Sequence, residues 1–230
     1  CDPHPMFNGV LPEPILKNLN ELQEAIIDYG ALLGLATDGD ADRFGVLDEH
    51  ASFVELHDLM PLMFEYLMKT RQWTGDVVRT TSMHHTIDQM VAKYDRRVIE
   101  VPVGFKHVCE QMLVSDILIG GEESGGFGFK NHIPERDGIL SCLLLLEMMV
   151  SCDTTLSHMV DILREEYGPF AYGRMDEYFD QAILIKNLES LLTNPPGSIA
   201  GLNVSDVSMT DGIKFYFREN AWMLIRVSQT

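Results

Sequence analysis

The pattern of apolar and polar positions divides the first part of the chain into helical and strand-like segments. Apolar residues recur at spacings of three and four over residues 15–29, which predicts an amphipathic helix that ends at Gly30. Short apolar runs at 32–36 and 44–47 predict two strands on either side of a polar, acidic loop. Residues 56–70 return to helical spacing and are rich in Met and Leu, which favours a helix that faces a core.

Regular alternation follows from residue 76. The predicted strands lie at 76–80, 98–101 and 116–119, and the predicted helices between them lie at 82–94 and 106–114. Ser82 is expected to cap the first of these helices. Two further helices are predicted at 138–150 and 155–167, after a glycine-rich polar segment. Strands that alternate with helices at this spacing indicate a βαβ layer with a largely parallel sheet.

The pattern changes after Gly168 and Pro169. An extended segment at 172–179, a helix at 182–192 and strands at 204–209, 213–217 and 222–227 are predicted beyond this point. The sequence therefore indicates an α/β fold, in which a mixed or parallel βαβ sheet with covering helices is followed by part of a smaller α+β domain.

Composition narrows the function classes. The chain of 230 residues has 17 Lys and Arg against 35 Asp and Glu, a formal net charge of −18. Such a field repels phosphate, so nucleic acid and anionic membrane surfaces are excluded as expected partners, and a phosphorylated ligand needs a local basic site or a metal ion. No apolar run reaches the ~20 residues that span a membrane. The four cysteines lack C-x-x-C spacing, which predicts reduced thiols and a cytoplasmic location.

An acidic loop holds the first candidate site. Asp38, Asp40 and Asp42 stand at alternate positions after a predicted strand, and Arg43 follows them. Closely spaced carboxylates suit Mg²⁺ or Ca²⁺, and a guanidinium beside them can hold a phosphate. A solvated acidic turn is the simplest alternative.

Two other families of loop share part of this pattern. An EF-hand would use Glu49 at its twelfth position, but it needs glycine at the sixth, where Arg43 stands. A phosphatase of the haloacid-dehalogenase type would use Asp38 as its nucleophile and Asp40 as its acid and base. That pattern wants Thr or Val where Asp42 stands, yet this hypothesis remains the alternative enzyme interpretation.

A glycine-rich loop at 120–128 holds the second candidate site. Its carboxylates and hydroxyl, in Glu122, Glu123 and Ser124, suit hydrogen bonds to the vicinal hydroxyls of a sugar, whereas the Gly-Lys-Ser/Thr of a phosphate-binding P-loop is absent. Lys106, at a predicted helix start, could meet a phosphate. The alternatives are a surface turn and a surface lysine. His84, His85 and His132 are interpreted as ordinary histidines, and residues 80–82 as helix-capping residues.

Four motifs together suggest a family. In order along the chain they are Thr37-Asp38-Gly39-Asp40-Ala41-Asp42-Arg43, Pro102-Val103-Gly104-Phe105-Lys106, Gly121-Glu122-Glu123-Ser124-Gly125-Gly126 and His132-Ile133-Pro134-Glu135-Arg136-Asp137-Gly138. This combination resembles the α-D-phosphohexomutases, specifically the phosphoglucomutase/phosphomannomutase group. The family has four domains. The resemblance implies that residues 1–50 end the second domain with its metal loop, that 51–168 form the third domain with its sugar-binding loop, and that 169–230 begin the fourth.

The resemblance also implies roles for individual residues. Asp38, Asp40 and Asp42 correspond to Mg²⁺ ligands, and Arg43 to a catalytic arginine against the phosphoryl group. The residues that correspond to substrate contacts are Lys106, Glu122, Ser124 and Arg136. The implied activity is the Mg²⁺-dependent interconversion of hexose 1-phosphate and 6-phosphate through a phosphoserine and a bisphosphorylated sugar, with glucose 1,6-bisphosphate as activator. The Glu-Glu-Ser-Gly-Gly form resembles that of glucose-preferring members.

The chain departs from the family in two places. The nucleophilic serine of the family lies in a Thr-Ala-Ser-His-Asn-Pro-like loop, which the 230 residues do not contain. The phosphate loop of the fourth domain usually reads Arg-Pro-Ser-Gly-Thr-Glu-Pro, whereas residues 226–230 read Arg-Val-Ser-Gln-Thr. We therefore expect a fragment of a longer protein that is catalytically silent by itself. A metal-binding or interaction fragment without catalysis is the non-enzyme alternative.

Overall fold

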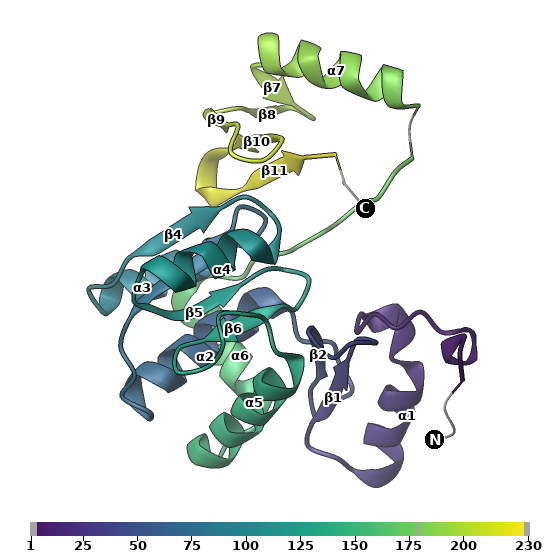
Figure 1. Cartoon of the computed structure of the whole chain (residues 1–230), viewed down its shortest axis with the longest axis vertical. Helices are drawn as coiled ribbons and strands as arrows, with labels where there is room; N and C mark the ends of the chain where they lie inside the picture. Colours follow the sequence, from purple (N-terminus) through teal and green to yellow (C-terminus); the bar gives the residue numbers. More distant parts are fainter. Residues whose placement is uncertain (1–3, 179, 228–230) are drawn as a thin grey trace. The chain divides into compact units, whose positions relative to one another are not determined.

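The computed structural model in Figure 1 describes residues 4–178 and 180–227. The chain forms two compact units that divide between Pro169 and Phe170, and each is described by itself. Besides the elements named below, short 3₁₀ turns lie at η1 (Phe7–Gly9), η2 (Leu16–Asn18) and η3 (Arg218–Asn220).

The first unit begins with a helix against a β-hairpin. Helix α1 (Asn20–Tyr29) ends at Gly30, whose φ of 60° makes a left-handed cap, as the sequence predicts. Strands β1 (Gly34–Thr37) and β2 (Phe44–Leu47) pair antiparallel, so residues 38–43 form the turn between them. A small core joins helix and hairpin through Leu19, Ile26, Leu47 and Ala51. Since a strand and not a helix precedes the acidic loop, the EF-hand alternative does not apply.

A four-stranded sheet forms the centre of this unit. Its order is β4 (Val98–Val101), β3 (Asp76–Thr80), β5 (Ile117–Gly121) and β6 (Phe127–Phe129). The first three strands are parallel and β6 pairs antiparallel with β5, so the predicted mixed or parallel sheet is confirmed. The sequence pattern did not predict β6, because Phe-Gly-Phe inside a glycine-rich stretch resembles a loop. Its pairing with β5 makes it a strand, and the rings of Phe127 and Phe129 are fully buried.

Helices cover both faces of the sheet. They are α2 (Leu56–Lys69), α3 (Thr86–Lys93), α4 (Phe105–Val114), α5 (Gly138–Cys152) and α6 (Leu156–Tyr167). The larger core contains residues of α2, α3, α5 and α6, and a smaller core contains those of α4. Val77 belongs to the first core and Val78 to the second, because successive side chains of a strand point to opposite faces.

Two features of these helices bear on the sequence predictions. Ser82 does not cap α3, which begins at Thr86 after His85; its hydroxyl bonds instead to Glu123. The capping prediction is wrong because the competing acceptor comes from the loop after β5, 41 residues along the chain. In the described part of the chain, no single helix is long and apolar enough to cross a membrane. Helices α5 and α6 together reach the necessary length and apolar composition, but the chain bends by 84° between them.

The second unit is smaller and contains both helix and sheet. Helix α7 (Gln181–Thr193) precedes a hairpin of β7 (Ser198–Ile199) and β8 (Leu202–Asn203). An antiparallel sheet follows, in the order β11 (Trp222–Ile225), β10 (Ile213–Tyr216) and β9 (Asp206–Ser208). The predicted α+β layout is confirmed, but residues 172–178 form no strand. Of the predicted phosphate loop, Arg226 pairs with Asp211, and residues 228–230 lie outside the described chain.

Glycine at position 125 lets the hairpin meet the end of the sheet. The backbone N–H of Phe44 donates to the Gly125 carbonyl at 3.1 Å, and the rings of Phe44 and Phe127 pack edge to face with centroids 5.1 Å apart. Gly125 has φ of 94°, and a Cβ there would lie 2.4 Å from the Phe44 carbonyl oxygen. Both its conformation and its space therefore require glycine.

Gly125→Ala should destabilise the first unit by roughly 2–4 kcal/mol, because strain at a positive φ adds to the collision with Phe44. Gly168→Ala is the matched control, since its φ is also positive, at 90°, but no atom lies within 4 Å of its Cβ position. Thermal or urea unfolding measures both. Equal losses in the two variants would show that the contact with Phe44 contributes nothing beyond backbone strain.

A buried histidine links α2 to the loop after β3. The ring of His57 is 2% exposed, and its Nδ1 accepts a hydrogen bond from the backbone N–H of His84 at 3.1 Å. Burial, with His84 nearby, lowers the pKa of His57 to about 3. The folded chain therefore holds this ring neutral at pH values where the unfolded chain protonates it.

Stability should consequently fall as pH drops from about 6.5 towards 3, because the unfolded state binds a proton that the folded state excludes. At pH 5 the loss from His57 alone amounts to about 2 kcal/mol relative to pH 7. Urea unfolding at both pH values should show a smaller difference in His57→Gln than in wild type. The exposed His50 supplies the control, and His50→Gln should keep the wild-type difference.

Candidate functional site

The three aspartates of the acidic loop lie close enough to share a cation. One carboxylate oxygen from each of Asp38, Asp40 and Asp42 lies within 4.8 Å of the others. Ligands about 2.1 Å from Mg²⁺ are separated by about 3–4 Å, so a small closure of the loop would suffice. Asp38 is buried, Asp42 is half-buried and Asp40 is exposed. The group of carboxylates is thus covered by protein at Asp38 and open to solvent at Asp40.

Arg43 holds Asp38 in place. Its backbone N–H donates to Oδ1 of Asp38 at 3.1 Å and its Nε donates to Oδ2 at 2.7 Å. Burial alone raises the pKa of the Asp38 carboxyl, but the hydrogen bonds from Arg43 outweigh it and hold that pKa below its usual value. Asp38 is therefore a fixed, ionised carboxylate.

Arg136 holds Asp42 from another part of the chain. Its Nε donates to Oδ2 of Asp42 at 2.5 Å, across 94 residues of sequence. Oδ1 of Asp42 is buried and has no hydrogen-bond partner among the described residues. Burial raises the pKa of Asp42, and the charge of Asp38 adds to the rise, against the effect of Arg136. A buried carboxylate oxygen that receives no hydrogen bond is suited to bind a cation. The residues of the loop are therefore compatible with Mg²⁺.

The glycine-rich loop after β5 forms a tight turn that aims its side chains in two directions. The backbone N–H of Gly125 donates to the carbonyl of Glu122 at 3.1 Å. Oε1 of Glu122 accepts from the Ser124 hydroxyl at 2.7 Å and from Arg136 at 3.1 Å. Burial raises the pKa of Glu122 more than the bond from Ser124 lowers it. Glu122 and Ser124 therefore form one hydrogen-bonded group beside Arg136.

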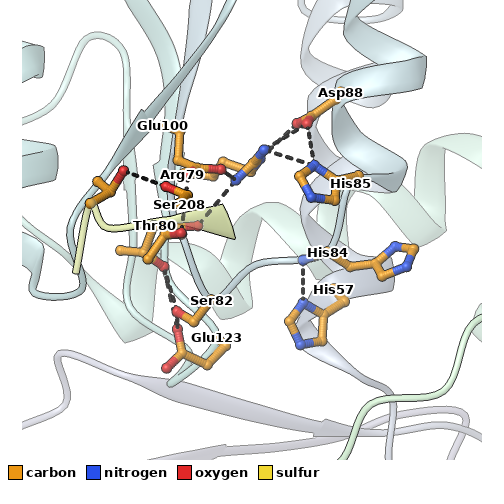
Figure 2. A network of polar contacts seen from close by, with 12 residues as sticks. His57, Arg79, Thr80, Ser82, His84, His85, Asp88, Glu100, Glu123 and Ser208 are labelled. Carbon is orange, nitrogen blue, oxygen red and sulfur yellow. Dashed lines mark hydrogen bonds and ion pairs between the residues drawn. The ribbon is translucent and has the colours of Figure 1, made fainter. Parts of the chain in front are cut away.

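Glu123 points towards the neighbouring strand, as Figure 2 shows. Its carboxylate accepts hydrogen bonds from Ser82 and, at 3.3 Å, from Thr80. The sequence did not predict these contacts, because Thr80 and Ser82 were interpreted as helix-capping residues. The signal that could have found them is topological: ligand sites of α/β sheets lie at the carboxyl ends of strands where the strand order changes direction, and β3 has β4 on one side and β5 on the other.

The buried Arg79, in strand β3, forms ion pairs with two carboxylates. It is 3% exposed and pairs with Asp88 through Nε at 2.7 Å and with Glu100 through Nη1 at 2.6 Å (Figure 2). Although burial opposes it, Arg79 together with His85 lowers the pKa of Asp88 to about 2. The cluster therefore supports the ends of β3 and β4 and offers no open guanidinium to a phosphate.

Two further residues singled out in the sequence lie outside this group of contacts. Lys106 is exposed in the first turn of α4, next to Phe105, whose ring lies 6.0 Å from the guanidinium of Arg136. His132 pairs with Asp137 at 2.9 Å. Nε of Arg43 also lies 3.9 Å from Oδ1 of Asp42. With this ion pair, the contacts join six of the eight predicted site residues directly: Asp38, Asp42, Arg43, Glu122, Ser124 and Arg136. Asp40 joins them within the aspartate loop. Lys106 is exposed while its neighbour Phe105 is buried, and none of these contacts includes Lys106.

Known proteins resemble this chain over most of its length. Two relatives are the phosphoglucomutase/phosphomannomutase of Thermococcus kodakarensis, 29% identical over 95% of this chain and 45% of the relative, and the phosphoglucosamine mutase of Methanocaldococcus jannaschii, 30% identical over 97% and 49%. A crystal structure from Thermus thermophilus, provisionally assigned as a phosphomannomutase, superposes with a TM-score of 0.83 at 34% identity. It matches 98% of this chain and 47% of that protein.

The chain thus spans about half the length of each of these relatives. Family profiles match two consecutive segments. Residues 1–51 match the phosphoglucomutase/phosphomannomutase α/β/α domain II, and residues 56–167 match α/β/α domain III. Since the two matched segments together make up well over half of the 230 residues, the chain belongs to the phosphoglucomutase/phosphomannomutase family of α-D-phosphohexomutases.

Proposed function

We propose that this chain is the metal-binding and sugar-binding portion of a phosphohexomutase, which moves a phosphoryl group between the 1 and 6 positions of a hexose. The observation that supports the proposal is the meeting of two loops. The aspartate loop at 38–43 and the Glu122–Ser124 loop share one arginine, Arg136, although they come from distant parts of the chain. A cation held by the aspartates and a sugar hydroxyl held by Glu122 and Ser124 would then lie side by side, as the transfer of phosphate to a sugar hydroxyl requires.

Asp38, Asp40 and Asp42 would hold Mg²⁺, which neutralises charge on the phosphoryl oxygens when it is bound. Arg43 would act beside it: its Nε bonds to Asp38 and its Nη1 lies 4.0 Å from the Glu13 carboxylate, which a phosphoryl group would have to replace as partner. The chain carries a net charge of −18, so it needs such local positive charge to accept an anionic substrate. We assign the exposed Lys106 to the same purpose at the rim.

Glu122 and Ser124 would bind the sugar hydroxyls. A hexose bisphosphate must turn around between the two transfers, so its contacts must work in both orientations. Hydrogen bonds to hydroxyls tolerate this reversal better than an apolar pocket shaped to one face would. Glucose is the hexose that we propose, with glucose 1,6-bisphosphate as activator; the relatives named above are called phosphoglucosamine mutase and phosphoglucomutase/phosphomannomutase.

The phosphatase alternative asks Asp38 to be a nucleophile. Both of its oxygens accept hydrogen bonds from Arg43, and its side chain is 2% exposed. A carboxylate held in this way is poorly placed to attack phosphorus, because attack needs an unencumbered oxygen in line with the leaving group. The geometry therefore favours a ligand role for Asp38.

The chain should bind Mn²⁺ or Mg²⁺ in a saturable manner, and Asp40→Asn should weaken that binding on the order of tenfold by removing one anionic ligand. Asp40 is exposed, so the variant should fold as wild type does. Isothermal titration or Mn²⁺ electron paramagnetic resonance measures the affinity. Asp28→Asn, at an exposed position of α1, removes the same charge elsewhere and should leave binding unchanged. Equal affinity in all three proteins would contradict the metal site.

The 230-residue chain should convert no glucose 1-phosphate, since it lacks the serine loop that the family uses as nucleophile. A coupled assay with Mg²⁺ and a trace of glucose 1,6-bisphosphate should detect neither glucose 6-phosphate nor free phosphate. A longer protein that contains this sequence and the serine loop should form glucose 6-phosphate, and Asp40→Ala should abolish that activity. Free phosphate released by the short chain would instead indicate a phosphatase.

A further inference from the structure

Arg136 contacts the aspartate loop and the sugar-binding loop with different nitrogens of one guanidinium. Its Nε donates to Oδ2 of Asp42 at 2.5 Å, and its Nη1 donates to Oε1 of Glu122 at 3.1 Å. We propose that Arg136 is a positioning residue whose two-sided contact makes cation binding at Asp42 and the orientation of Glu122 depend on each other. This inference rests on the function proposed above, and it assigns Arg136 a role other than direct contact with substrate.

On the aspartate side, Arg136 determines which oxygen of Asp42 is available. With Oδ2 engaged by the guanidinium, Oδ1 is left buried and without a hydrogen-bond donor among the described residues. A ligand carboxylate is oriented by the outer groups that bond to its second oxygen. Arg136 therefore turns Asp42 so that its available oxygen is Oδ1.

On the sugar side, Arg136 fixes the rotamer of Glu122. Oε1 of Glu122 receives both Arg136 and the hydroxyl of Ser124, at 3.1 and 2.7 Å. With Oε1 engaged in this way, Oε2 is the oxygen that would accept a hydrogen bond from a sugar hydroxyl. A carboxylate that is fixed before the ligand arrives loses less conformational entropy on binding.

The shape of the site also determines where Arg136 lies. A Cβ on Gly126 would come within 2.9 Å of Cδ of Arg136 and 3.3 Å of Oε1 of Glu122, so any larger residue there would have to displace the Arg136 side chain. Two residues after Arg136, the backbone N–H of Gly138 donates to the carbonyl of Ala41 at 3.0 Å. The backbone that carries Arg136 is thus attached to the aspartate loop itself.

Arg136→Lys separates geometry from charge. Lysine keeps the positive charge but has a single nitrogen, so it cannot donate to Asp42 and Glu122 in the forked arrangement of a guanidinium. If Arg136 acted by charge alone, the variant would bind cations as wild type does. Because we assign it a positioning role, we expect Arg136→Lys to weaken Mg²⁺ binding about tenfold.

A second readout follows the other loop. In ¹H–¹⁵N spectra of the wild-type 230-residue chain, titration with Mg²⁺ should shift the amides of Gly125 and Gly126 together with those of the aspartate loop. In Arg136→Lys the response of these glycines should fall by more than half. Arg71→Lys is the matched control: Arg71 is partly exposed and pairs with Glu147 on α5, and its replacement should change neither affinity nor spectra.

Gly126→Ala provides an independent variant with no change of charge. Its added methyl group should displace Arg136 and reproduce the weaker Mg²⁺ binding, with the Gly125 amide as the reporter. Thermal unfolding by circular dichroism shows whether each variant folds, and the amide spectrum of the remaining loops shows it residue by residue.

The outcomes are distinct. Weaker Mg²⁺ binding and a reduced glycine response in both Arg136→Lys and Gly126→Ala would support the inference. Wild-type affinity and wild-type glycine shifts in either folded variant would overturn it. A wild-type chain that shows no saturable Mg²⁺ binding would instead contradict the proposed metal site itself, before any variant is compared.

Discussion

The candidate site depends on the attraction between two arginines and a group of carboxylates that repel one another. Asp38 and Asp42 lie in one short loop, and Glu122 is buried beside them. Without compensating charge, such groups would bind protons or move apart. Arg43 compensates Asp38 from within the loop, while Arg136 compensates Asp42 and Glu122 together. The loops can therefore stay close without a bound cation.

The sheet supplies the place where this attraction operates. The loops after β3 and β5 leave neighbouring strands at their carboxyl ends, and Glu123 bonds to residues of the β3 end there. The hairpin that carries the aspartates reaches the β5 loop through the hydrogen bond between Phe44 and Gly125. Close approach of two backbones requires glycine at 125, since a Cβ there would collide with the Phe44 carbonyl, whereas a Cβ at 126 would meet the side chains of Arg136 and Glu122.

The two loops lie in segments that match consecutive domains of the phosphohexomutase family. The aspartate loop belongs to the domain II segment, and the glycine-rich loop at 120–128 belongs to the domain III segment. The contacts between these domains are extensive enough that they form one compact unit in this chain. A metal site and a sugar site built on separate domains can act on one substrate only if such contacts fix their relative positions.

Most of the elements and the chemical character of the loops follow from the sequence by itself. The helical spacing of apolar residues in α1 and α2, and the alternation of strands and helices from β3 to β5, predicted the secondary structure. These patterns can be recognised locally, because the side chains that one element turns towards the core recur at that element's own period. The aspartate loop and the Glu-Glu-Ser loop were recognisable from residue type and spacing, and the family from their order. The sequence did not reveal the short strand β6 or the role of Ser82, because each depends on a partner from another segment of the chain. Tertiary structure alone decided that Arg136 joins Asp42 to Glu122, because a long flexible side chain has many possible partners and only packing against Gly126 and Phe105 selects these two.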